Sequence, residues 1–200
     1  MKMPKSWNQV TLSQLYELDL LRQRTDLDAE EQMNQVLSVL SGTSIEDIES
    51  IPHNERIAIY RKMDWLGQYP DKKPKKRRFK IGSKTYRIVD NPANISAGEY
   101  ATIQVIASDG NFIKNINQIL ACLLVEQKRN WFGWRDVRYD KSRSSEEFHR
   151  KSRIIMQELS VGQAYPYALF FSHLLPELLQ VFQTYSLKMM EDLRKEAVIG

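Results

Sequence analysis

The sequence has few of the residue types and motifs on which enzymes and metal sites are commonly built. Cys122 is the single cysteine, which excludes an internal disulfide and any metal site made from several cysteines. The eight glycines form no P-loop, GxGxxG or GxSxG pattern. His53, His149 and His173 lie on three separate expected elements, without a metal-ligand spacing such as HExxH. We therefore predict a protein that is not an enzyme and that uses no metal or cofactor.

Long hydrophobic runs are also absent. No stretch approaches the roughly 18 apolar residues of a membrane span. The basic start, MKMPKSWNQ, is not followed by an apolar segment, so we expect neither a signal peptide nor a membrane partner. What the chain does contain is 42% hydrophobic residues, with four Trp, nine Tyr and seven Phe among 200 residues. This composition supports a folded core in one ordinary domain or two small ones.

Positive charge is confined to one short segment. Residues 72–89 contain nine Lys and Arg and no acid, whereas residues 1–71 contain seven basic and twelve acidic residues. Residues 90–200 contain thirteen of each sign. The net charge of +4 therefore describes a nearly neutral protein with one basic stripe, between an acidic part and a neutral part.

The first 69 residues predict a helical unit with short loops. Thr11 and Gln14 form a capping-box pattern, and an amphipathic helix is expected to follow. A second helix is expected from about Asp28 to Ser41, with Gly42 after its end, then a short helix capped by Ser44. A longer helix is predicted over about residues 54–67.

Residues 70–90 predict a basic linker that leads into a β-hairpin. Phe79 and Ile81 alternate with Lys80, GSK supplies a tight turn, and Tyr86 and Ile88 continue the alternation. Because an isolated hairpin is marginal in water, we expect it to pack on helices or to pair with another chain.

Residues 91–200 predict a C-terminal helical region that could form one domain with the first unit. A capping box at Ser96 and Glu99 starts one helix, and residues 111–125 form an apolar core helix that buries Cys122. A polar, aromatic loop is expected over residues 127–143, followed by a charged helix. A long helical segment begins at Ser160 and is kinked near Pro176. The predicted fold class is thus α+β and mainly helical.

The basic stripe has three interpretations. It is a solvated connector or a charged edge strand protected against aggregation, a contact for an acidic protein surface, or a nucleic-acid site. The alternation favours a charged connector into a hairpin over a dedicated nucleic-acid site. The residues in question are Lys72, Lys73, Lys75, Lys76, Arg77, Arg78, Lys80, Lys84 and Arg87.

Aromatic and methionine side chains supply the candidate protein interface. Trp131, Phe132 and Trp134 stand with arginines in the loop NWFGWRDVRY, a composition typical of interface hot spots. The alternative is that these tryptophans fix the loop onto the helical core. Met189 and Met190 lie on an amphipathic C-terminal segment where flexible side chains suit an adaptable surface, although ordinary core filling is the favoured explanation.

The order of these segments resembles small proteins encoded among bacteriophage structural genes. The segments that carry the resemblance are WNQVTLSQLYEL, VLSVLSGTSIEDIESIPHNE, DWLGQYP and FKIGSKTYRIVDNPANISAGEYATI, then ILACLLVEQ, YDKS, EEFHRK and ALFFSHLL. Related chains are tail assembly chaperones or minor virion components.

This resemblance implies a non-enzymatic role in an infected bacterium, in the host cytoplasm or in the virion. A chaperone of this kind holds aggregation-prone helical segments of the tape-measure protein, whereas a structural subunit forms part of a connector, neck or tail. The expected partners are tape-measure or tail proteins, and a homo-oligomer is compatible with either role. Nucleic-acid binding through the basic stripe is the third hypothesis. The resemblance provides no catalytic residue to carry over.

Overall fold

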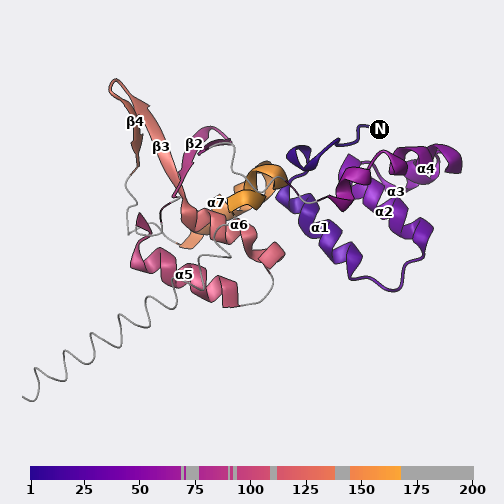
Figure 1. Cartoon of the computed structure of the whole chain (residues 1–200), viewed down its shortest axis with the longest axis horizontal. Coiled ribbons are helices and arrows are strands. Elements are labelled where there is room, and N and C mark those ends of the chain that lie inside the picture. The colour runs from indigo at the N-terminus through magenta and orange to yellow at the C-terminus, as the bar shows by residue number, and fades with distance from the viewer. Residues whose placement is uncertain are drawn as a thin grey trace, which may run out of the picture.

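The chain folds into an N-terminal helical unit and a second part in which helices cover a four-stranded antiparallel sheet (Figure 1). The computed structural model describes residues 1–68, 70, 77–89, 91, 94–108, 112–137 and 145–167. The mainly helical α+β class that the sequence predicts is confirmed.

The N-terminal helical unit (residues 7–67) is built from short helices whose ends are capped as the sequence predicts. Its elements are η1 Trp7–Gln9, α1 Leu12–Arg22, α2 Ala29–Ser41, α3 Ile45–Glu49, α4 His53–Arg61 and η2 Asp64–Gly67. Thr11 and Gln14 form the expected capping box at the start of α1. Gly42 ends α2 at φ +70°, a conformation that glycine adopts without steric cost.

The last predicted helix of this unit is shorter than expected. α4 ends at Arg61, and residues 64–67 form a separate 3-10 turn in place of a continuous helix to residue 67. The break lets Trp65 lie edge-on against Trp7, with ring centroids 5.3 Å apart. The Trp7 indole N–H also donates to the Gln68 carbonyl at 2.6 Å. Tertiary aromatic packing therefore outweighs helix propensity here.

The predicted hairpin is confirmed and forms half of the sheet. β1 Arg78–Ile81 and β2 Lys84–Ile88 pair in antiparallel fashion around a turn at Gly82, whose φ is +58°. β2 pairs next with β3 Leu124–Asn130, and β3 pairs with β4 Gly133–Asp136. The sheet order is β1-β2-β3-β4. The hairpin is thus stabilised by its own chain, in line with the expectation that it needs a neighbour.

The predicted polar loop over residues 127–143 is wrong where the structure describes it. The core helix ends at Leu123, and Leu124 and Val125 already belong to β3. The alternation of apolar and polar residues that indicates a strand is weak in β3 and β4. Of their residues, only Leu124 has an apolar side chain buried on the inner face of the sheet.

Three helices hold the core: α6 and α7 contact the sheet, and α5 packs on α6. α5 Ala97–Ser108 starts at the predicted Ser96–Glu99 capping box, where the Ser96 N–H donates to the Glu99 carboxylate at 2.9 Å. α6 Phe112–Leu123 packs against α5 and against α7 Ser145–Glu158, and α7 contacts β1. The central side chains of α6 are almost fully buried: Ile116, Ile119, Leu120 and Leu123. Each contributes about 1.5–3 kcal/mol relative to an exposed position.

A short backbone contact joins the two parts of the molecule. The Leu12 N–H donates to the Leu159 carbonyl at 3.1 Å, and the Val161 N–H donates to the Val10 carbonyl at 2.7 Å. Thr11 and Ser160 form the bridge between these bonds. The residues therefore pair like two small antiparallel strands at the point where α1 begins and α7 ends.

The final expected segment begins as predicted. The Gln163 side-chain oxygen accepts from the Ser160 N–H at 3.3 Å and from its hydroxyl at 3.0 Å, and residues 161–167 are helical. The continuation to about residue 197, with its kink at Pro176, lies outside the described residues. No helix in the described part of the chain has both the length and the apolar character needed to cross a membrane.

Candidate functional site

Among the described residues, the most exposed aromatic side chains lie at the end of the hairpin formed by β3 and β4. Trp131 is 97% exposed and Phe132 is 87% exposed, and both occupy the turn between the strands. This hairpin projects from the rest of the molecule (Figure 1). Large exposed aromatics on a projecting element are characteristic of binding surfaces. The alternative, that Trp131 fixes this segment onto the helical core, is wrong for the fold as described.

The turn that carries these aromatics has a defined geometry. The Phe132 N–H donates to the Asn130 side-chain oxygen at 3.1 Å. Gly133 follows at φ +117°, a value that residues with a side chain rarely adopt. We call residues 128–135 the hairpin tip.

Three cations flank the two aromatics within the hairpin tip. Lys128, Arg129 and Arg135 are exposed, and among the described residues no acidic side chain forms an ion pair with them. Lys128 and Arg135 are directly opposite each other in the strand register. Like charges at such a position repel each other across the ladder. The hairpin tip therefore combines apolar anchors with positive charge that is not compensated locally.

Trp134 differs from the other two aromatics because it takes part in the sheet's own side-chain network. The Arg78 guanidinium lies 5.6 Å from the centre of the Trp134 ring, and Trp134 is only 39% exposed. Arg78 also donates to the Gln127 side-chain oxygen at 2.9 Å. Trp134 thus stabilises the base of the hairpin tip, with Arg78 reaching over from β1.

A polar network ties all four strands together on the outer face of the sheet. Gln127 of β3 donates to the Asp136 carboxylate of β4 at 2.7 Å, and Arg87 of β2 forms an ion pair with Asp136 at 2.6 Å. With Arg78 of β1, the network spans every strand. Its cations are therefore engaged within the fold, which fixes the direction in which the hairpin tip projects.

Stability should depend on the ionisation of Asp136. The hydrogen bond from Arg87 is the main cause that lowers the pKa of the Asp136 carboxyl below 3.8. The Asp136 carboxylate is therefore protonated at a higher pH in the unfolded chain than in the folded chain. The stability that ionised Asp136 contributes is present above about pH 3.8 and is lost as the pH falls through the pKa of the folded state. We expect Asp136→Asn to reduce the free energy of unfolding by up to about 1 kcal/mol at pH 7. Urea titrations from pH 3 to pH 7 should show the gap to wild type closing towards pH 3, and a constant gap would contradict this role.

The structure distributes the basic residues of the sequence-predicted stripe among different roles. Lys84 forms an ion pair with Glu126 at 2.6 Å, whereas Lys80 is exposed on β1 and Arg77 stands directly before that strand. Arg78 and Arg87 belong to the network described above. Lys72, Lys73, Lys75 and Lys76 lie outside the described residues, as do Met189 and Met190. The described part of the stripe is therefore mostly strand, with only some of its charge available to a partner.

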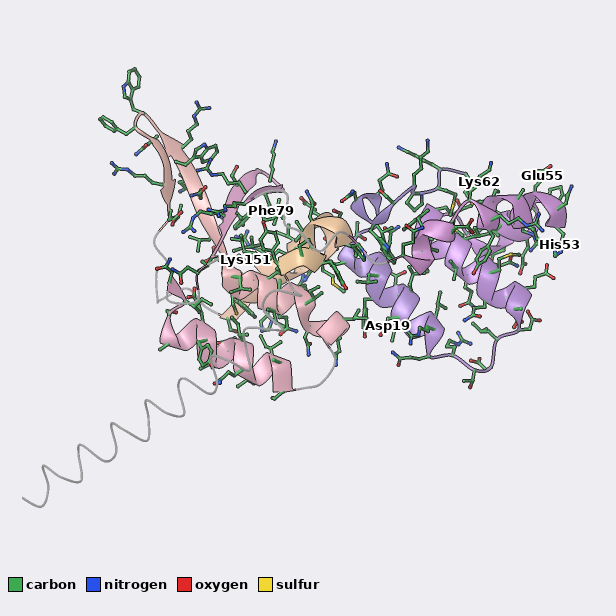
Figure 2. The ribbon with its side chains drawn as sticks, in the orientation of Figure 1. Asp19, His53, Glu55, Lys62, Phe79 and Lys151 are labelled. Carbon is green, nitrogen blue, oxygen red and sulfur yellow. The ribbon has the colours of Figure 1, made fainter. Side chains whose placement is uncertain are left out.

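Cys122 is buried, and Lys151, labelled in Figure 2, lies close enough to it for the two groups to interact electrostatically. Burial raises the pKa of the Cys122 thiol to about 12 and lowers the pKa of the Lys151 ammonium to about 8. The Lys151 Nζ donates to the carbonyl of Ala121 at 2.6 Å and to that of Leu124. It also lies 5.5 Å from the centre of the Tyr86 ring. Lys151 thereby satisfies carbonyls at the end of α6, where the chain turns into β3.

Cys122 should be unreactive while the protein is folded. A pKa raised from 9.0 to about 12 lowers the thiolate population roughly a thousand-fold at a given pH, and burial blocks access as well. We expect its reaction with a chromogenic disulfide reagent at pH 8 to be at least about a hundred-fold slower in buffer than in denaturing urea. Equal rates under the two conditions would show that α6 is not buried as described.

The histidines and acids form no site of their own in the described parts of the chain. His53 lies 3.6 Å from Glu30, and His149 contacts Phe148 edge-on, whereas His173 lies outside the described residues. The described residues contain no group of three or more His, Cys, Asp or Glu side chains that could hold a metal ion.

Sequence reasoning identified the aromatics of the hairpin tip and the arginines that follow them, but it missed Lys128 and Arg129. Lys128, Arg129 and Arg135 lie outside the basic stripe, in a segment interpreted as a loop. The available signal was the turn sequence NWFG between two charged segments of similar length, which is a hairpin pattern with glycine at the turn.

Comparison of the chain with protein-family models, curated proteins and solved structures finds no match.

Proposed function

We propose that this chain is a non-enzymatic bacteriophage tail or virion assembly protein that acts by protein–protein contact, with the hairpin tip as its docking arm. One observation carries the proposal: Trp131 and Phe132 are almost fully exposed on a fixed turn, beside three cations. Paired aromatics next to arginine are the side chains that contribute most to protein binding energy. Transfer of such a pair into a partner's pocket removes a large apolar area from water.

The assembly role itself is supported by the resemblance of the sequence to proteins encoded among phage structural genes. We favour the chaperone form, in which the protein holds helical segments of the tape-measure protein in the host cytoplasm until the tail tube forms. The many apolar side chains within residues 168–182 provide the hydrophobic composition for that capture. The hairpin tip then supplies a second, charged contact that orients the complex.

The proposal is tested by binding to a fragment of the tape-measure protein encoded by the same phage. The purified chain and the fragment should form a complex in size-exclusion chromatography and should improve the fragment's solubility. Duplex and single-stranded DNA at two salt concentrations serve as the comparison, because phosphate contacts weaken steeply with salt. Binding to DNA but to no phage structural protein would contradict the proposal and favour the nucleic-acid hypothesis.

A structural subunit of the virion is the alternative, and the outer strand of the sheet favours it. Within the described residues β4 pairs only with β3, so its other edge is open to a neighbouring strand. Mass spectrometry of purified particles separates the two roles. A chaperone is absent from mature particles, whereas a structural subunit is present in a fixed copy number.

A further inference from the structure

We propose that the hairpin tip binds the N-terminal helical unit of a second copy of this chain, so that copies join head to tail. This inference depends on the docking role of the hairpin tip in the proposed function and names a partner for it. It follows from the organisation of the tip, the charge of the helical unit and the separation of the two within one molecule.

The hairpin tip is prepared for an acidic partner. Its turn is held by the bond from the Phe132 N–H to Asn130, so little conformational entropy is lost when the aromatics bind. Lys128 and Arg135 oppose each other in register, and an acidic side chain placed between them would relieve their repulsion. The same partner must offer apolar contacts for Trp131 and Phe132.

The N-terminal helical unit has the complementary composition. Residues 7–67 contain eleven Asp and Glu but only five Lys and Arg. Glu46 and Glu49 of α3 are exposed, and no hydrogen bond or ion pair of their side chains occurs within the described residues. Leu20 and Tyr60 add exposed apolar surface, at 45% and 43% exposure. The unit therefore has both exposed carboxylates and exposed apolar side chains, the two kinds of group that the hairpin tip requires.

These two surfaces cannot meet within one molecule. In Figure 1 the hairpin of β3 and β4 projects at the upper left, whereas α2, α3 and α4 lie on the right. Their contact must therefore join two copies. Because two different surfaces are used, each copy keeps a free tip and a free acidic unit, and growth continues beyond a dimer.

Sedimentation velocity of the full chain tests the inference directly. The monomer has a mass of 23.5 kDa. At about 100 µM in low salt we expect an average mass above that of a dimer, which falls towards the monomer on dilution or in about 0.5 M salt. Trp131→Ser with Phe132→Ser should leave a monomer, whereas Val105→Ser, at an exposed apolar position on α5, should associate like wild type.

Two variants that complement each other provide the sharper test. Glu46→Lys with Glu49→Lys reverses charge on the acidic unit and should also give a monomer. The variant with Trp131→Ser and Phe132→Ser keeps an intact N-terminal helical unit, and the variant with Glu46→Lys and Glu49→Lys keeps an intact hairpin tip. A mixture of the two should therefore form a one-to-one dimer and nothing larger. Circular dichroism checks that each variant is folded.

Several results would overturn the inference. A wild-type protein that stays monomeric at every concentration would do so, as would association that stops at a dimer or that the tip substitutions leave unchanged. Binding of the tip to anionic lipid vesicles, without self-association, would assign the tip to a membrane surface instead. Self-association is measured without any other protein, so its failure is distinct from a failure to bind the tape-measure fragment.

Discussion

Replacing Trp131 and Phe132 by serine should weaken partner binding by about a hundred-fold or more while leaving the fold intact. Each side chain is almost fully exposed, so neither contributes to the core. Truncation of an aromatic hot spot costs about 2 kcal/mol or more of binding energy, and a hundred-fold loss corresponds to about 2.7 kcal/mol. Isothermal titration with the tape-measure fragment measures the loss, and urea unfolding should show a change in stability within about 0.5 kcal/mol.

Val105→Ser is the matched control for this experiment. Val105 is 72% exposed on α5, so it removes apolar surface at a site away from the hairpin tip. Its binding affinity should equal that of wild type. Equal loss in the control would mean that general surface hydrophobicity drives binding, and unchanged binding in the tip variant would remove the tip from the interface.

Gly162→Ala should destabilise the protein by about 1–2 kcal/mol, because a methyl group there would displace the Asn8 side chain and press on the Asn8 backbone where the two parts meet. A Cβ atom at position 162 would lie 2.1 Å from the Asn8 side-chain oxygen and 3.1 Å from the Asn8 backbone nitrogen. In a helix without such a neighbour the same change would stabilise by about 0.5–1 kcal/mol. Urea unfolding followed by circular dichroism measures the difference.

The neighbouring side chain and a second glycine supply the controls for Gly162. Asn8→Ala removes the closest atom, so the double variant should recover part of the lost stability, which is a coupling that a double-mutant cycle detects. Gly98→Ala lies in α5, where an added Cβ meets nothing within 4 Å, and it should be neutral or stabilising. If Gly162→Ala behaves like Gly98→Ala, the two parts do not pack through Gly162.

Local signals in the sequence predicted the elements whose ends are determined by nearby residues. The capping boxes at Thr11 and Ser96 depend on residues three positions apart, and the β1–β2 turn depends on one glycine. Such patterns are visible without knowledge of the fold. The early end of α4 was not, because it follows from the packing of Trp65 against Trp7, which is distant in sequence.

The β3–β4 hairpin shows why the sheet and the full site could not be predicted. Its strands are mostly polar or charged, and the pairing of β3 with β2 depends on contacts across more than thirty residues of sequence. In the sequence, nothing distinguishes Gln127 from other polar residues. In the fold, it accepts a hydrogen bond from Arg78 and donates one to Asp136. The aromatics of the tip and their arginines were recognisable by composition, whereas the measured exposure and the position of Lys128 opposite Arg135 required the three-dimensional arrangement.

The most direct test of the account places a photoreactive phenylalanine analogue at position 132 in infected cells. Irradiation should link this position to a phage tail protein or to the acidic helical unit of a second copy, and mass spectrometry identifies the partner peptide. The same analogue at position 105 reports background contacts. Protein cross-links that are specific to position 132 are the predicted result, whereas cross-links to lipid or nucleic acid alone, or none above background, would contradict the claim that the protein acts through its hairpin tip.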